Sequence, residues 1–139
     1  MQSPDYQITR LPNPLLLLCV LLVAWQPLNV GLSAARTLDS IALGGPPLVF
    51  ALVLRLLVAA VGLAAGLALF GRHSGALTLA RVALVMSAAL DLFVSLTPYV
   101  PGNRAPGETP VFVAASLAYH AAWLLYLSRS RRVRAAFDH

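Results

Sequence analysis

Four apolar stretches, each long enough to cross a lipid bilayer as a helix, alternate with short polar segments along this chain of 139 residues. A hydrocarbon core of roughly 30 Å requires about 20 mostly apolar residues in a helix, and a helix satisfies its backbone polar groups without help from water. The stretches cover approximately residues 14–35, 47–70, 76–97 and 110–127, followed by a basic tail at 128–139. The sequence therefore predicts an all-α, polytopic membrane protein whose single domain spans residues 1–139.

Composition supports this class. Charged residues make up 11% of the chain and hydrophobic residues 59%, whereas soluble domains carry about 25% charged residues. The connections between the apolar stretches are short, and they include the Gly-Gly-Pro-Pro run at 44–47 and the polar turn at 71–75. Short connections place sequential helices side by side and antiparallel, so we expect an up-down four-helix transmembrane bundle with a first loop at 36–46.

The arginines are distributed unequally between the two ends of this predicted bundle. Cytoplasmic segments of membrane proteins carry the excess of basic residues, so both termini of this multi-pass protein are predicted to be cytoplasmic. We expect the basic tail to contact anionic lipid headgroups, with no nucleic acid as partner. The richer side holds Arg10, Arg72, Arg81, Arg129, Arg131, Arg132 and Arg134, and the other side holds Arg36 and Arg104; among these, Arg81 is expected to snorkel to the cytoplasmic surface.

A cleaved secretory signal is the alternative interpretation of the first stretch. Arg10 precedes an apolar core, and Ser-Ala-Ala at 33–35 resembles a cleavage site. The preceding segment contains Trp25 and Pro27, which are unsuited to the approach to such a site, so a spanning helix kinked at Pro27 is favoured.

Two opposite charges lie inside the apolar stretches, where each costs on the order of 2.5 to 3.5 kcal/mol. Arg55 lies in the second stretch and Asp91 in the third. Counted from the outer ends of their helices, with Tyr99 closing the third, both lie about 12 Å deep. We therefore predict that they form an intramembrane ion pair that faces the interior of the bundle.

Other polar residues fall at a similar depth, about 10 to 15 Å from the outer ends of the helices. Gln26 and Asn29 come from the first stretch and His120 from the fourth. The sequence thus predicts a polar layer to which every span contributes. This layer has either a structural role, in which it fixes helix register, or a functional one, in which Asp91 and His120 bind a ligand or relay protons. We expect no metal site, because no second histidine or acidic cluster has ligand spacing.

The function predicted from the residues is that of an integral membrane protein of unknown activity, structural or accessory and non-enzymatic, with a membrane protein as a possible partner. No nucleophile motif, carboxylate pair or phosphate loop is present, and no cofactor is expected. A small proton-coupled transporter that uses the polar layer is the alternative, and a lipid-interacting or quinone-adjacent protein is the third. The Gly-x-x-x-Gly pair Gly62 and Gly66 packs helices closely, either within the chain or in a dimer.

The end of the chain resembles the closing signature of a domain-of-unknown-function family of small four-span bacterial inner-membrane proteins. That signature pairs a Trp and a Tyr at the end of the last helix with Ser-x-Arg-Val and a final Phe. The matching residues are Trp123, Tyr126, Ser130, Arg132, Val133 and Phe137. The resemblance implies four spans, a multi-pass location in the bacterial inner (plasma) membrane and no known activity. On its own residues, the tail is predicted to continue the last helix, with Val133 and Phe137 facing the lipid surface as an interfacial foot.

Overall fold

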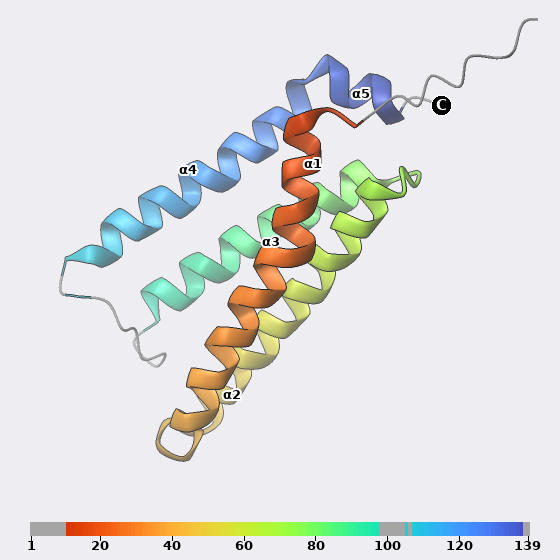
Figure 1. Cartoon of the computed structure of the whole chain (residues 1–139). Helices are drawn as coiled ribbons and strands as arrows, with labels where there is room; N and C mark the ends of the chain where they lie inside the picture. The colour runs from red at the N-terminus through yellow and green to blue at the C-terminus, as the bar shows by residue number, and fades with distance from the viewer. Residues whose placement is uncertain (1–10, 98–104, 106, 138–139) are drawn as a thin grey trace, which may run out of the picture.

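A computed structural model describes residues 11–97, 105 and 107–137, and every regular element in this part of the chain is a helix. Arg10 and Arg104, used to predict the orientation, and Tyr99, used to predict the depth of Asp91, lie outside the described residues. The elements are α1 (Asn13–Val20), the π-helix η1 (Leu21–Trp25), α2 (Gln26–Phe70), α3 (Ala76–Leu96), α4 (Glu108–Arg129) and α5 (Arg131–Phe137) (Figure 1). Three helical runs in the described part, Asn13–Phe70, Ala76–Leu96 and Glu108–Arg129, are long and apolar enough to cross a membrane. The prediction of an all-helical chain with several membrane-compatible helices is confirmed.

The 58-residue run Asn13–Phe70 reverses direction at Gly45 (Figure 1). Gly45 has φ 63° and ψ −161°, a conformation that is open to glycine and strained for residues with a Cβ. Pro46 and Pro47 follow, and proline is tolerated at a helix start because the first N–H groups have no intrahelical acceptor. We call residues 13–44 the first arm and residues 46–70 the second arm.

The predicted first loop is wrong, because residues 36–44 continue the helix of the first arm. Hydroxyl groups in this polar stretch hydrogen-bond to their own helix. The Thr37 Oγ1 donates to the Ser33 carbonyl at 2.8 Å, and the Ser40 Oγ donates to the Arg36 carbonyl at 3.3 Å. Residues 36–43 contain no glycine or proline, and polar side chains alone do not end the helix there.

The two arms approach each other closely at Gly62 and Gly66. A Cβ built on Gly66 would lie 2.6 Å from Val23 Cγ2 and 3.1 Å from Leu22 Cβ, and one built on Gly62 would overlap the Gln26 side-chain oxygen. The glycine pair therefore packs two segments of the same chain, which is the first of the two alternatives drawn from the sequence. Packing of small residues is a main source of helix association where lipid replaces water.

The first arm contains a π-helical turn just before Pro27. The Gln26 N–H donates to the carbonyl of Leu21, five residues earlier. Pro27 has no N–H, so the Val23 carbonyl lacks its usual α-helical donor, and the wider turn accommodates the break. The irregularity predicted at Pro27 is thus present, and it takes the form of this turn.

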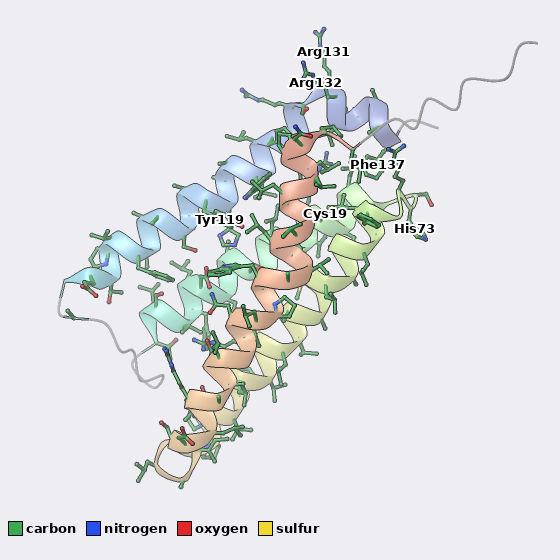
Figure 2. The ribbon with its side chains drawn as sticks, viewed as in Figure 1. Cys19, His73, Tyr119, Arg131, Arg132 and Phe137 are labelled. Carbon is green, nitrogen blue, oxygen red and sulfur yellow. The ribbon has the colours of Figure 1, made fainter. Side chains whose placement is uncertain are left out.

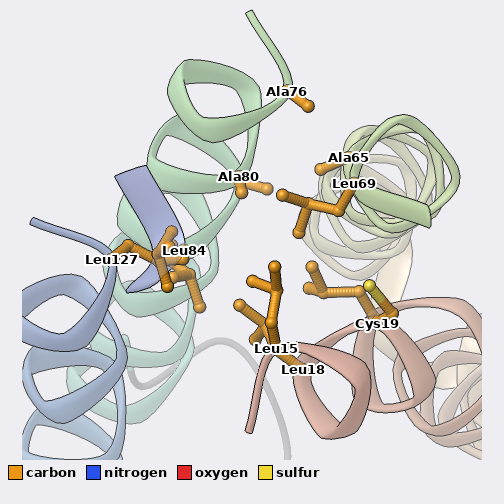
Figure 3. Close-up of a cluster of buried hydrophobic side chains, with 12 residues drawn as sticks. Leu15, Leu18, Cys19, Ala65, Leu69, Ala76, Ala80, Leu84 and Leu127 are labelled. Atoms are coloured by element: carbon orange, nitrogen blue, oxygen red, sulfur yellow. The ribbon is translucent and has the colours of Figure 1, made fainter. Parts of the chain in front are cut away.

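A hydrophobic cluster fills the end of the molecule where α1 begins, α2 ends and α4 ends (Figure 3). Leu15 and Leu18 from α1 and Leu69 from α2 are fully buried there. Alanines on α3 allow these helices to come together, and Leu127 of α4 joins from the other side. The buried members are Leu15, Leu18, Cys19, Leu22, Ala65, Leu69, Ala76, Ala80, Ala83, Leu84, Leu127 and Val133.

The tail does not form the predicted lipid-facing foot. At Ser130 the backbone leaves the helix of α4, with ψ 115°, and the Ser130 hydroxyl then accepts a hydrogen bond from the Val133 N–H at 3.4 Å. The same residue therefore ends α4 and caps α5. As a result Val133 is fully buried and Phe137 packs against the cluster, whereas Arg131 and Arg132 project outward (Figure 2).

Replacing Gly66 by Ala tests the close approach of the two arms. Overpacking at such a contact costs about 1 to 3 kcal/mol, so we expect the Gly66→Ala variant to unfold at a lower temperature than the wild type in detergent. The matched control is Gly31→Ala in the first arm, because nothing lies within 4 Å of a Cβ built there. Alanine is the better helix former, so this control should be as stable as the wild type or slightly more stable. Equal destabilisation by both substitutions would contradict the packing described here.

Candidate functional site

Polar side chains from both arms, α3 and α4 line a single cavity of about 470 Å³. It lies farther along the helices than the hydrophobic cluster, which closes the end that holds α5. The structure brings together at this cavity all five residues predicted for the polar layer and its ion pair. Its polar lining consists of Gln26, Asn29, Ser33, Arg55, Ser87, Asp91, Ser116, Tyr119 and His120.

Gln26 connects the first arm to α3 across the cavity. Its Nε2 donates to the Ser87 Oγ at 3.0 Å, and its side-chain oxygen lies against Gly62. The π-helical turn that ends at Trp25 sets the rotation at which Gln26 leaves the first arm. Gly62 has no Cβ, so the Gln26 side chain can occupy the space beside it. The π-helical turn and Gly62 together position the Gln26 side chain.

Asp91 connects α3 to α4 through Ser116. The Ser116 Oγ donates to the Asp91 Oδ2 at 2.6 Å, a short distance typical of a hydroxyl that donates to a carboxylate. The sequence predicted the depth of Asp91 in the bundle but did not predict its hydrogen bond with Ser116. The available signal was the spacing, because Ser116 precedes His120 by four residues and therefore shares its helix face.

His120 is the most enclosed polar group of the site, with an exposed fraction of 7%. Its Nδ1 lies 2.8 Å from the carbonyl oxygen of Ser116. A carbonyl only accepts hydrogen bonds, so this bond requires the proton on Nδ1, and in the neutral ring Nε2 is then the acceptor. The Tyr119 ring meets the imidazole edge-to-face at a centroid distance of 5.1 Å. The carboxylate, the hydroxyl and the imidazole thus form one polar group of three residues.

Arg55 lines the same cavity from the second arm and is half-buried. Asp91 takes its hydrogen bond from Ser116, so the direct ion pair between Arg55 and Asp91 stays a prediction. The cavity nevertheless contains one basic and one acidic side chain on neighbouring elements, together with an imidazole.

Arg81 bonds to the C-terminal end of α4, and its snorkelling to the cytoplasmic surface stays a prediction. Its Nη2 donates to the Leu127 carbonyl of α4 at 3.2 Å, and its Nε is buried. Because α4 ends at Arg129, the Leu127 carbonyl has lost its helical donor, and a basic side chain near a helix C-terminus can supply one. Arg81 therefore ties the start of α3 to the end of α4.

The remaining residues of the tail signature lie at the closed end. Trp123 and Tyr126 pack against the hydrophobic cluster, and their rings meet edge-to-face at 5.9 Å. Arg132 is exposed, and Ser130 caps α5. In this structure the signature residues serve to close the terminal end of the molecule, away from the cavity.

Comparison with family models, curated proteins and solved structures finds no match to this chain. The resemblance of the tail to a family of small four-span membrane proteins stays a prediction.

A double-mutant cycle tests the contact between Ser116 and Asp91. A hydrogen bond to a charged group contributes about 1.5 to 3 kcal/mol, so Ser116→Ala should lower the free energy of unfolding in mixed micelles. Combined with Asp91→Asn, its effect should be non-additive by about 0.5 kcal/mol or more. Ser128→Ala, at an exposed position of the same helix, is the control and should add to Asp91→Asn without coupling. Full additivity at Ser116 would show that the pair contributes no coupling energy.

Proposed function

We propose that this protein is an integral membrane protein with four spans, located in the bacterial inner membrane with both termini in the cytoplasm. The reversal at Gly45 supports four spans, because it divides the run Asn13–Phe70 into two antiparallel arms of 32 and 25 residues (13–44 and 46–70). The arginine asymmetry supports the orientation. The turn at Gly45 would then face the outside and the turn at 71–75 the cytoplasm.

Cysteine labelling tests this topology. Cys19 is buried and is the sole cysteine, so a Cys19→Ala background carries no native thiol. Leu43→Cys places a thiol beside the outer turn, where Leu43 is 93% exposed, and Ser74→Cys places one in the exposed inner turn. In intact spheroplasts a membrane-impermeant maleimide should label the first variant and not the second, and lysis should make both reactive. The reverse pattern would invert the proposed orientation.

The function that the geometry supports best is that of a small proton-coupled carrier, which acts without catalysing a chemical transformation. The observation that carries this proposal is the cavity of about 470 Å³. Binding sites for small molecules commonly have volumes of about 300 to 1,000 Å³ and present a few polar groups in a mostly apolar wall. A polar layer with a purely structural role would have its groups packed against one another and would leave no such space among them.

Asp91, Ser116 and His120 support the coupling to protons. The carboxylate and the imidazole both contact Ser116, with distances of 2.6 Å and 2.8 Å to its hydroxyl and its carbonyl oxygen. Ionisable groups within membrane spans commonly mark proton and substrate pathways. A proton that arrives at either group changes the charge of the cavity wall, and this change links protonation to the binding of a charged solute.

An accessory or structural role is the second candidate, and a specific observation favours it. Hydrogen bonds among the described residues join different helices, and they include Gln26 to Ser87, Ser116 to Asp91, and Arg81 to the Leu127 carbonyl. Such bonds hold helices in register, as a scaffold for a partner protein requires.

Flux measurements in liposomes separate the two roles. The purified full chain is reconstituted with an entrapped pH dye, and a mixture of L-amino acids, monocarboxylates and primary amines is added outside. A carrier should show solute-dependent movement of protons, and Asp91→Asn or His120→Gln should reduce its rate at least tenfold without loss of folded protein. Asp39→Asn and His73→Gln, at exposed positions away from the cavity, are the matched controls and should retain the wild-type rate.

An accessory protein would behave differently in the same experiments. It would show no flux above empty liposomes, Asp91→Asn would lower its stability, and a paired Arg55→Leu and Asp91→Leu substitution would restore stability. This outcome would overturn the carrier proposal and favour the second candidate.

A further inference from the structure

We infer that the cavity opens toward the lipid between the first arm and α4, and that it binds an uncharged, hydroxyl-bearing amphiphile from the bilayer. The hydroxyl head of this ligand hydrogen-bonds to Asn29 and His120, and its apolar tail leaves past Trp25 and Tyr119. The inference rests on the proposed membrane topology and on the role of the cavity as a binding site. It goes beyond the carrier proposal, because it does not depend on the movement of protons or of a charged solute.

The opening follows from the way in which the helices pack. The first arm packs against the second arm, and α4 packs against α3. At the closed end, Leu15 of the first arm and Leu127 of α4 belong to the same hydrophobic cluster. From there the two helices diverge (Figure 1), and side chains from both line the cavity. The cavity is therefore bordered on one side by the first arm and on another by α4.

Aromatic rings on these two borders are exposed. Trp25 of the first arm is 59% exposed and Tyr119 of α4 is 42% exposed, and both line the cavity. By the helical rise, Tyr119 lies about 15 Å from either end of α4. The side of a spanning helix at this depth faces acyl chains, because the hydrocarbon core is roughly 30 Å thick. The cavity thus communicates with hydrocarbon at these rings, and an apolar tail can pass between them.

Two uncharged polar groups of the cavity wall lack a partner within the described residues. The Asn29 carboxamide, which can both donate and accept, has no hydrogen bond to this part of the chain. His120 uses Nδ1 for the Ser116 carbonyl, and its Nε2, the acceptor of the neutral ring, has no hydrogen bond to the same residues. Polar groups without a partner are costly in apolar surroundings. A hydroxyl head satisfies both groups, because it donates to Nε2 and exchanges hydrogen bonds with the carboxamide.

The charged residues of the cavity do not require a charged ligand. Asp91 accepts a hydrogen bond from Ser116, and Arg55 has an interaction of its own within the protein. A ligand that enters from the bilayer must also carry its head through hydrocarbon, where an ionised group is expensive. An uncharged head avoids this cost. Acylglycerols and isoprenoid quinols share the required chemistry, since both join hydroxyl groups to an apolar tail.

Fluorescence quenching at Trp25 tests the inference. Trp25 and Trp123 are the two tryptophans of the chain, so Trp123→Phe leaves a single indole at the opening of the cavity. The full chain with this substitution is placed in nanodiscs of dioleoylphosphatidylcholine, a lipid without hydroxyl groups, and is titrated with 1-(9,10-dibromostearoyl)glycerol. Bromine quenches indole fluorescence at short range, so a bound tail that passes Trp25 should quench it saturably.

Competition with compounds that carry no bromine identifies the head. We expect 1-oleoylglycerol to restore the fluorescence at a mole fraction at least tenfold lower than oleate, oleylamine or 1-octadecene, which carry an anionic head, a cationic head and no polar head. In a second arm, nanodiscs contain 1-oleoylglycerol and decylubiquinol in equal amounts, and native mass spectrometry of the released protein shows which of the two is retained. Retention of either compound supports the inference and identifies the source.

Variants assign the head to its two contacts. Asn29→Ala and His120→Phe should each weaken the binding of the brominated acylglycerol at least tenfold, because each removes a hydrogen-bonding group from the cavity wall. Asn13→Ala and His73→Phe repeat these changes at exposed positions outside the wall and should leave the binding unchanged. If His120→Phe does not fold, Asn29→Ala, at an exposed position, and the competition still decide the question.

The results that overturn the inference differ from those that overturn the carrier proposal. Quenching that does not saturate, or that oleate, oleylamine or 1-octadecene relieve as well as 1-oleoylglycerol, rules out a site for a hydroxyl head. Unchanged binding in both Asn29→Ala and His120→Phe rules it out as well, and so does competition by free glycerol as strong as that by 1-oleoylglycerol. None of these outcomes bears on proton flux. Selective binding of the amphiphile without proton flux in liposomes supports the inference and rules out the carrier.

Discussion

A polar group inside an apolar helix must find its partner within the protein, and this constraint determines how the helices of this chain meet. Asp91 accepts from Ser116 of the adjacent helix, and Gln26 donates to Ser87. Each bond joins two helices, so it fixes their rotation and their relative height together. The cost of leaving such a group without a partner is several kcal/mol in hydrocarbon. Aliphatic packing alone would permit many registers, and these bonds select among them.

Small residues allow the polar groups to reach each other. Gly62 and Gly66 bring the second arm against the first, and the alanines of α3 admit buried leucines from α1 and α2. Where packing is close, around Leu15 and Leu69, the molecule is filled by aliphatic side chains. Farther along, the same helices carry longer polar side chains, and the cavity lies among them. One end of the molecule is therefore a solid core, and the cavity lies beyond it.

The sequence predicted those features that depend on composition and local chemistry. The apolar stretches, the turns at Gly45 and at 71–75, and the convergence of Arg55, Asp91 and His120 on one level follow from hydropathy, from glycine and proline, and from the helical rise. The predicted loop is wrong at residues 36–44. Hydroxyl groups there hydrogen-bond within the helix and allow a polar segment to remain helical.

The features that the sequence did not predict depend on side-chain direction and on a choice between competing partners. Depth placed Asp91 in the polar layer, but it did not predict the hydrogen bond that Ser116 of α4 donates to the carboxylate. The hydrogen bond from Arg81 to the Leu127 carbonyl at the end of α4 was not predicted either. Ser130 was compatible with a continuous helix, and its hydroxyl instead caps a new one. In each case the outcome depends on the direction of a side chain, which residue spacing alone does not give.

The attachment of α4 links this architecture to the proposed role. The helix packs against α3, and at its C-terminal end Arg81 and the buried Val133 hold it to the closed core. At the level of the cavity, its contact with Asp91 is the hydroxyl of Ser116. In the proposed carrier, a charged solute in the cavity would lie near the same carboxylate and would change the strength of that contact. Protonation of the carboxylate would make it a weaker acceptor and would act on the same contact. Solute and proton would then act on one hydrogen bond between two helices, and this shared target is how the binding of one could depend on the other.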